Sequence, residues 1–318
     1  MSETRPRYLV HLALFVATVL TTTAQGAAYV HHGPMTPLWD GLHYSIPLLA
    51  ILVSHEMGHY VAARIHGVPA SLPYFIPLPP PIGLLGTMGA VIMQSGTTDR
   101  RKLIDIGAAG PLAGLVVAIP ILTYGLTLSE VRPLTGIGTQ EGNSLAYALL
   151  KRVTKGEWLP GGGRDVMMHP TAWAGWAGLL LTMLNLLPVG QLDGGHVATA
   201  YFGNRYQRVG RLVHAALPVL ALGVLLQTHG VAQRELAGYP AAAGQLSAEL
   251  IATQAALPWA VWFALLFLMK WLSGGQYHPP VSDARLPRNR ALVFWITCVT
   301  FVLIFMPVPL RFVVGSQP

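Results

Sequence analysis

Charged residues are scarce in this sequence. Asp, Glu, Lys and Arg make up 10% of its 318 residues, whereas they make up about a quarter of an ordinary soluble domain. The mean hydropathy is +0.50, and 53% of the residues are hydrophobic. Water cannot solvate the whole surface of a chain with so few charges. The composition therefore excludes an ordinary soluble protein and predicts one that lies in a lipid bilayer.

Cysteine and acidic residues are also few. The single cysteine, Cys298, excludes an intramolecular disulfide, and its place in the apolar run 291–306 indicates a packing role. The 13 acidic residues against 20 Lys and Arg give a formal charge of +7. Because the basic residues lie in short clusters between apolar runs rather than along one face, we expect no nucleic-acid partner.

Apolar runs of about 20 residues, the length that crosses a bilayer as a helix, recur along the chain. They predict spans at 8–28, 42–66, 103–128, 171–188, 208–228, 257–273 and 291–312. The first run resembles a signal peptide, but it stays apolar through Val30 without a small-residue cleavage site, which favours a retained helix. We therefore predict an all-α polytopic membrane protein of six or seven transmembrane helices, forming one domain over 1–318 with its core at 40–312.

The basic clusters predict the orientation of the spans. With the N-terminus inside, 13 of the 20 Lys and Arg residues lie in cytoplasmic segments, and five of the other seven lie in the connection 129–170. We expect 129–170 to be a solvated extracytoplasmic loop, in which the glycines at 161–163 form a flexible link. We also expect the membrane to be the plasma membrane of a bacterium or an archaeon.

Prolines exclude a spanning helix between the second and third apolar runs. Five prolines lie within 73–81, and they remove backbone donors and break helical geometry. The apolar, glycine-containing stretch 84–93 follows them and predicts a short strand pair or a re-entrant loop, so 73–95 is expected to form a membrane-associated hairpin. Irregular backbone at membrane depth needs protein or a water-filled cavity to satisfy it, so a cavity is expected beside it.

Polar residues interrupt the second apolar run, in the order His55, Glu56 and, one helical turn later, His59. The spacing places both imidazoles on one helix face, where they can reach one metal ion at about 2.0–2.1 Å. Glu56 then lies beside the open coordination position, the arrangement of the His-Glu-x-x-His zinc hydrolases. Ionisable residues inside a span are costly and usually functional, which disfavours a purely structural polar face.

Two histidines leave a catalytic zinc ion one protein ligand short. Asp193 lies among glycines and apolar residues after the fourth span, and the predicted topology puts it toward the cytoplasmic side, as it does His55 and His59. A carboxylate is a normal third ligand. A helix cap is the alternative role, but an acid that is buried without a cation is expensive, which favours the metal ligand.

The motif His55-Glu56-Met57-Gly58-His59 is followed by Asn185-Leu186-Leu187-Pro188, which leads into Leu192-Asp193-Gly194-Gly195-His196. Together these segments resemble the paired signature of the site-2 protease family of intramembrane zinc metallopeptidases. The segment Gly107–Gly114 in the third span is similar to the family's Gly-Pro element, and the likeness extends over about residues 40–310.

The resemblance implies one zinc ion per chain, held by His55, His59 and Asp193, with Glu56 as the general acid and base. The implied activity is regulated intramembrane proteolysis, the hydrolysis of peptide bonds within or near transmembrane segments of membrane-protein substrates. It also implies that Asn185 holds the substrate backbone, the alternative being an amide bonded between helices. The hairpin would present a strand edge to the substrate. The oligomeric state does not follow from the sequence.

Other functions compete for the same residues. A metal transporter is disfavoured by Glu56, because transit needs no carboxylate beside the open position. A silent binder of membrane segments is disfavoured by the complete set of four site residues. A different membrane zincin, such as a prenyl-protein endopeptidase, would usually use a glutamate as third ligand. Outside these motifs, His196 could orient Asp193 or occupy a turn, His214 is expected in the core, and no role follows for His278.

Overall fold

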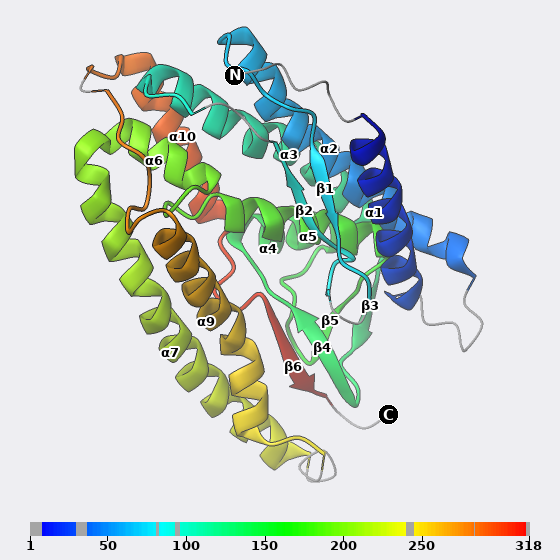
Figure 1. Cartoon of the computed structure of the whole chain (residues 1–318). Helices are drawn as coiled ribbons and strands as arrows, with labels where there is room; N and C mark the ends of the chain where they lie inside the picture. The colour runs from blue at the N-terminus through cyan, green and yellow to red at the C-terminus, as the bar shows by residue number, and fades with distance from the viewer. Residues whose placement is uncertain are drawn as a thin grey trace.

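Long apolar helices and six short strands make up the computed structural model, which describes residues 8–29, 37–80, 83–92, 96–239, 245–282 and 284–315 (Figure 1). The helices are α1 (Tyr8–Tyr29), η1 (Leu38–Gly41), α2 (Leu42–Ile65), α3 (Arg100–Leu128), α4 (Leu145–Lys155), α5 (Pro170–Asn185), α6 (Asp193–Phe202), η2 (Gly203–Arg205), α7 (Tyr206–Gly238), α9 (Ala248–Leu272) and α10 (Arg288–Ile304). The strands are β1 (Tyr74–Pro77), β2 (Thr87–Val91), β3 (Glu130–Pro133), β4 (Ile137–Glu141), β5 (Arg164–Met167) and β6 (Leu310–Val314).

Small residues bring α2, α3 and α5 close together at the centre of the molecule. A Cβ atom added to Gly58 of α2 would lie 2.5 Å from the carbonyl oxygen of Ala109 in α3. A Cβ atom added to Gly175 of α5 would lie 2.6 Å from Leu122 of α3. Such close approach maximises van der Waals contact between helices in a membrane, where the lipid offers no hydrophobic drive for their association.

The chain between α2 and α3 forms the expected hairpin. β1 and β2 pair antiparallel, with Tyr74 opposite Val91, and the register shifts before Pro77. Hydroxyl groups satisfy three carbonyls at its tip, since Thr21 donates to Gly86, Tyr29 to Leu84 and Tyr44 to Leu85. Satisfying these groups is what irregular backbone among membrane helices requires. The hairpin lies within the predicted segment 73–95, but only β2 lies in the stretch 84–93 where a strand pair or a re-entrant loop was expected, because β1 lies among the prolines. The membrane association of this segment, which includes residues outside the described ones, stays a prediction.

The C-terminal end of the chain differs from the prediction. The apolar run 291–312 was expected to be one span, but α10 ends at Ile304 and the residues after it form β6, which pairs antiparallel with β4. Pro307 and Pro309 account for the difference, because a proline lacks the backbone donor that a helix interior needs. β6 therefore packs on the connection between α3 and α5.

The connection 129–169 has more regular structure than a solvated loop. It contains β3, β4, α4 and β5, and β3 pairs antiparallel with β5. The glycines at 161–163 were expected to be a flexible link, but Gly161 forms a β-bridge with Arg164. Gly162 and Gly163 have φ angles of 58° and 72°, so they make the left-handed turn that this bridge needs.

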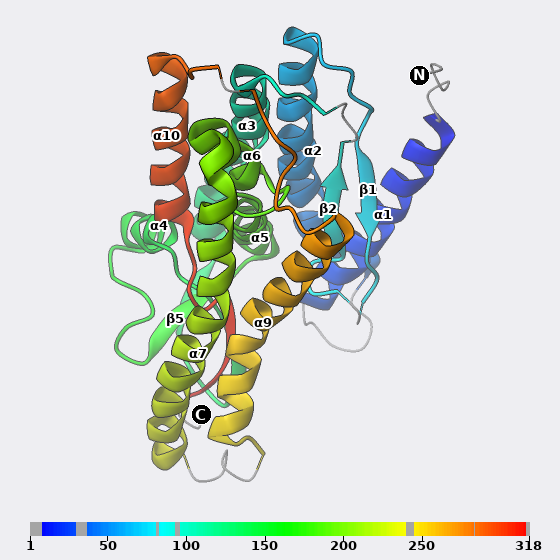
Figure 2. The same cartoon turned by 60° about the vertical axis from the view of Figure 1, so that its left-hand side comes forward.

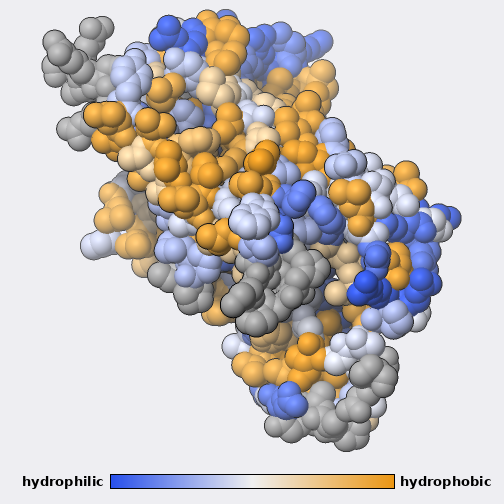
Figure 3. Space-filling view, turned by 90° about the vertical axis from the view of Figure 1, so that its right-hand side faces the viewer, coloured by the Kyte–Doolittle hydropathy of each residue, from blue (hydrophilic) through white to orange (hydrophobic). Residues whose placement is uncertain are grey.

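Within the described residues, five helical segments are long and apolar enough to cross a membrane: Tyr8–Tyr29, Leu38–Ile65, Arg100–Leu128, Asp193–Gly238 and Ala248–Leu272. α5 has 16 residues and α10 has 17, shorter than a usual span, so the count of six or seven spans stays a prediction. Apolar side chains cover much of the face in Figure 3, with hydrophilic ones along its upper rim. α7 and α9 pack against each other along their length (Figure 2).

A buried ion cluster lies in the connection 129–169. Lys151 of α4 is fully buried, and its Nζ lies 3.4 Å from Glu141 Oε1 and 3.3 Å from Asp165 Oδ1. Asp165 also accepts hydrogen bonds from the Gln140 side chain and from the backbone N–H of Val166. One buried cation therefore faces two buried carboxylates, and Asp165 has the better set of donors.

Of the two carboxylates in this cluster, Glu141 is the one that takes up a proton more readily than usual. Burial raises the pKa of Glu141 to about 7, against an ordinary value of 4.5, although Lys151 opposes the shift. Because the folded pKa is the higher one, proton uptake stabilises the fold fully below about pH 4.5. That stabilisation is lost as the pH rises through about 7, and its size is on the order of 3 kcal/mol.

We expect the melting temperature of the purified protein in detergent to fall by several degrees between pH 5 and pH 8. Glu141→Gln keeps the shape and a hydrogen-bond acceptor for Tyr147 but does not titrate, so it should flatten this dependence. Glu130→Gln on β3 is the matched control, because its side chain is 68% exposed. An unchanged pH dependence in Glu141→Gln would contradict the assignment.

Candidate metal and catalytic site

His55 and His59 lie on the same face of α2, as their spacing predicts. Both side chains are buried, and their Nε2 atoms lie 3.2 Å apart. His59 Nδ1 lies 2.8 Å from the carbonyl oxygen of Ile106 in α3. A carbonyl accepts only, so Nδ1 carries the proton and Nε2 presents a lone pair. This is the usual way in which a protein orients a metal-binding histidine.

Asp193 reaches the two histidines from the first residue of α6. α5 ends at Asn185, and Pro188 and the positive φ of Gly190 (67°) turn the chain before α6 begins. The two glycines after Asp193 are sterically required, because a Cβ on Gly194 would overlap the Leu186 carbonyl and one on Gly195 the carbonyl of Gly190. Asp193 Oδ2 lies 3.2 Å from His55 Nε2, and its Oδ1 lies 3.2 Å from His59 Nε2.

These three side chains have the geometry of a metal site. His55, His59 and Asp193 each offer one donor atom, and all three atoms lie within 4.8 Å of one another. Donors about 2.0–2.1 Å from a tetrahedral zinc ion lie about 3.3 Å apart, close to the observed 3.2 Å. Two imidazole lone pairs face one carboxylate here, which is a donor set that zinc accepts. The residues therefore fit a mononuclear zinc ion.

One face of α3 backs the metal-binding residues. Gly107, Gly110 and Gly114 lie three and four residues apart and so line one side of the helix. A Cβ on Gly110 would overlap the His59 ring, and one on Gly114 would lie 3.2 Å from His55 Cβ. From the sequence alone, this segment could only be recognised as similar to a family element. Its steric role depends on helix packing, which no spacing along α3 reveals.

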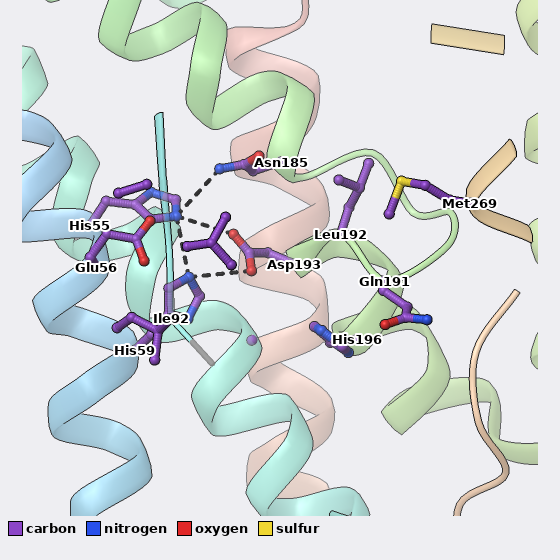
Figure 4. A pocket seen from close by; sticks show the side chains of 13 residues that line it. His55, Glu56, His59, Ile92, Asn185, Gln191, Leu192, Asp193, His196 and Met269 are labelled. Carbon is purple, nitrogen blue, oxygen red and sulfur yellow. Dashed lines mark hydrogen bonds and ion pairs between the residues drawn. The ribbon is translucent and has the colours of Figure 1, made fainter. Parts of the chain in front are cut away.

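The candidate ligands line a cavity of about 330 Å³ (Figure 4). Glu56 lies in its wall beside His55, and its residue is 5% exposed. The Asn185 amide donates to His55 Nε2 over 3.4 Å. The other lining residues come from β2 and its end, from α3, from the loop before α6, from α6 itself and from α9: Ala90, Val91, Ile92, Gly107, Gln191, Leu192, His196 and Met269. The predicted hairpin thus borders the predicted site.

Three further histidines with roles considered in the sequence analysis lie outside the metal cluster. His214 is buried, and its ring bonds the Tyr277 hydroxyl and the Phe263 carbonyl, which confirms a core position. His196, for which the sequence left open a role in orienting Asp193 or a turn position, lies in the first turn of α6, and its Nδ1 contacts His278. His278, 82 residues further along the chain, had no predicted role because no spacing signal links residues so far apart.

Known proteins resemble this chain over the same region. Residues 43–226 match Peptidase family M50. The chain is 32% identical over 246 residues to "Probable zinc metalloprotease EGY1, chloroplastic" of Arabidopsis thaliana, covering 68% of this chain and 44% of that protein. It is 27% identical over 231 residues to Rip3 of Mycobacterium tuberculosis, also named as a zinc metalloprotease, covering 68% of this chain and 47% of that one.

The chain spans about half the length, or less, of the curated proteins that it resembles. No solved structure matches it. The family match covers more than half of this chain and includes the three candidate metal ligands, Glu56 and Asn185. This chain, an integral membrane protein, therefore belongs to peptidase family M50.

Proposed function

We propose that this protein is an intramembrane zinc metalloprotease, which hydrolyses peptide bonds within or near the transmembrane segments of other membrane proteins. One observation carries the proposal. A three-donor metal cluster and a carboxylate that is not part of it, Glu56, line the same cavity among the membrane helices. A metal-transport site needs the donors but not the additional carboxylate. The zinc metalloproteases among the relatives support the same activity.

The proposed roles follow from the geometry of the site. His55, His59 and Asp193 would hold one zinc ion and leave a position open toward the cavity. When bound, zinc would polarise the scissile carbonyl and lower the pKa of water from 15.7 to about 7. Glu56 would accept the proton of the attacking water and pass it to the leaving amine. Asn185, whose partner His55 Nε2 would then bind the metal, would be free to hold the substrate backbone.

The substrate must lose helical structure before it can be cut. A transmembrane helix hides its carbonyls in hydrogen bonds within itself, so a scissile carbonyl becomes accessible only after local unwinding. β2 and its end supply Ala90, Val91 and Ile92 to the cavity wall. An unwound segment could add to this strand edge and regain its backbone hydrogen bonds there. We therefore expect substrates with helix-weakening residues near the cut.

Metal removal tests the proposal. The purified protein should hold about one zinc ion per chain and cut a synthetic transmembrane peptide of about 24 residues with Gly and Asn at its centre, hereafter the test peptide. A chelator should abolish cleavage and added zinc should restore it. Asp193→Ala should retain well under one zinc ion, because two imidazoles leave the metal under-coordinated. Asp40→Ala in η1, away from the cavity, is the control.

Two outcomes of these experiments would contradict the proposed roles. Full zinc content and full cleavage in Asp193→Ala would remove Asp193 from the metal site. Wild-type protein that carries zinc across vesicle membranes but leaves the test peptide intact would identify a transporter.

We further propose that the site lies toward the cytoplasm, in the plasma membrane of a bacterium or an archaeon. The bacterial relative supports this location, whereas the plant relative is named as chloroplastic. The basic residues at the end of α2 and at the starts of α3, α7 and α10 support the orientation. Asp193 precedes α7 at the same end of that helix, which supports a cavity near the cytoplasmic surface.

Cysteine labelling tests the orientation, and the single native cysteine makes it simple. In a Cys298→Ala background, cysteines at Arg101 and Arg208 should react with an impermeant reagent only from the cytoplasmic side. A cysteine at Arg132 of β3, whose side chain is 62% exposed, should react only from the opposite side. The reversed pattern would overturn the orientation and leave the enzymatic proposal untouched.

A further inference from the structure

His196 occupies the cavity wall without belonging to the metal cluster. It lines the cavity from the first turn of α6, and Figure 4 shows Asp193 between His196 and Ile92 at the end of β2. Its ring is not one of the three donors that lie together. His196 Nδ1 lies 2.8 Å from Nε2 of His278. The residue thus contacts the cavity on one side and the segment between α9 and α10 on the other.

The hydrogen bonds of His278 determine which nitrogen of His196 carries a proton. His278 Nδ1 lies 2.7 Å from the carbonyl oxygen of Pro279, which can only accept, so Nδ1 donates. Burial lowers the pKa of His278, so its ring is neutral near pH 7 and its Nε2 is an acceptor. His196 must then donate from Nδ1. In neutral His196 the remaining nitrogen, Nε2, is left with a lone pair.

The described residues offer this Nε2 no partner, but they hold the ring firmly. His278 is 4% exposed, and both ends of the Gln207 side-chain amide clamp its segment by bonding the Tyr277 N–H and the His278 carbonyl. A Cβ on Gly107 would lie 3.0 Å from His196 Cβ, so α3 packs tightly against the other side. A residue that merely filled a turn would not need this support.

We propose that His196 is a substrate-binding residue, whose Nε2 accepts a backbone N–H of the unwound substrate segment in the cavity. His278 is its positioning residue. The assignment rests on the proposed proteolytic function, since it concerns the segment that is to be cut. It adds a polar contact on the side of Asp193 that lies away from the end of β2 (Figure 4).

The geometry of an extended peptide gives the physical reason. Successive residues of such a peptide direct their N–H groups to opposite edges, so pairing with β2 satisfies one edge only. A peptide N–H without a partner in a site that excludes bulk water costs about 1–3 kcal/mol. An acceptor across the cavity from the strand removes this cost. A neutral imidazole does so without placing another negative charge beside Asp193.

Two substitutions test the roles of the two His196 nitrogen atoms separately. His196→Asn keeps an amide donor near the place of Nδ1 but has nothing at the place of Nε2. His196→Gln extends further and can place its carbonyl oxygen there. Binding of the test peptide is measured in nanodiscs with Glu56→Gln in every protein, so that nothing is cut. His196→Asn should weaken binding about 5- to 100-fold, and His196→Gln should stay within about threefold of the unsubstituted protein.

An ester scan of the test peptide identifies the N–H itself. Each central amide is replaced in turn by an ester, which lacks the N–H. At one position the ester should weaken binding to the protein with His196 by the same factor as His196→Asn does, and should have no further effect on His196→Asn. Positions that pair with β2 should weaken both proteins equally. His278→Phe should reproduce part of the loss, because it removes the acceptor that orients His196.

The outcomes distinguish this assignment from the proposed function. If the protein neither binds nor cuts the test peptide, the proposed function fails and this assignment fails with it. If the protein cuts the peptide but His196→Asn binds it as tightly, or no ester position distinguishes the two proteins, only the assignment to His196 fails. Loss of zinc from His196→Asn, or loss of folded protein in both variants, would give His196 a metal-site or structural role and would also overturn it.

Discussion

Glu56→Gln should leave the zinc content at about one ion per chain and lower the rate of test-peptide cleavage by about 10²- to 10⁴-fold. Glutamine has the shape of glutamate and fits the same wall of the cavity, where Glu56 is 5% exposed. It lacks the carboxylate that would accept the proton of water. The loss can exceed this range if Glu56 also delivers that proton to the leaving amine.

Zinc content by elemental analysis and cleavage of the test peptide are measured on the same preparations. The control is Glu130→Gln on β3, which makes the same chemical change at an exposed position and should have no effect on either quantity. Retained zinc with lost cleavage separates a proteolytic site from a transport site, because transport does not need the carboxylate. Cleavage by Glu56→Gln near the wild-type rate would exclude Glu56 as the general base.

The local parts of the site follow from the sequence because helical spacing determines them. His55 and His59 are one turn apart, so any helix through this segment brings their rings together. Asp193 lies 138 residues from His55, and it could be predicted because a third ligand was needed and the segment around it resembles a known motif. The hairpin was predictable for a similar reason, since clustered prolines leave few alternatives at membrane depth.

The parts that the sequence did not predict depend on contacts between distant segments. The last predicted span was apolar enough for a helix, and although Pro307 and Pro309 explain why the helix ends early, the pairing of its end with β4, about 170 residues earlier, leaves no signal in the local sequence. The contact of His196 with His278 likewise joins α6 to the loop after α9. Lys151 lies on a short amphipathic helix, where a solvated position would be expected, yet its side chain is completely buried beside Glu141 of β4 and Asp165 of β5, and this depends on how those strands pack against α4.

The glycine face of α3 is another contact that the sequence did not predict, and a substitution there should have a second large effect. A Cβ on Gly110 would overlap the His59 ring, which is held from its other nitrogen by the Ile106 carbonyl. The ring cannot move away without losing either that hydrogen bond or its place beside Asp193. We therefore expect Gly110→Ala to hold well under one zinc ion per chain and to cut the test peptide at least about 100-fold more slowly.

The rest of the fold should tolerate this change, since alanine favours a helix over glycine by about 1 kcal/mol. Gly223→Ala on α7 is the matched control, because a Cβ there meets nothing within 4 Å, and it should keep full zinc and full cleavage. Gly114→Ala should fall between the two, because its Cβ would lie 3.2 Å from His55 Cβ and a small shift could accommodate it. Zinc content, cleavage and melting temperature are measured for all three variants. Wild-type zinc binding by Gly110→Ala would mean that α3 does not hold His59 in the way the structure describes.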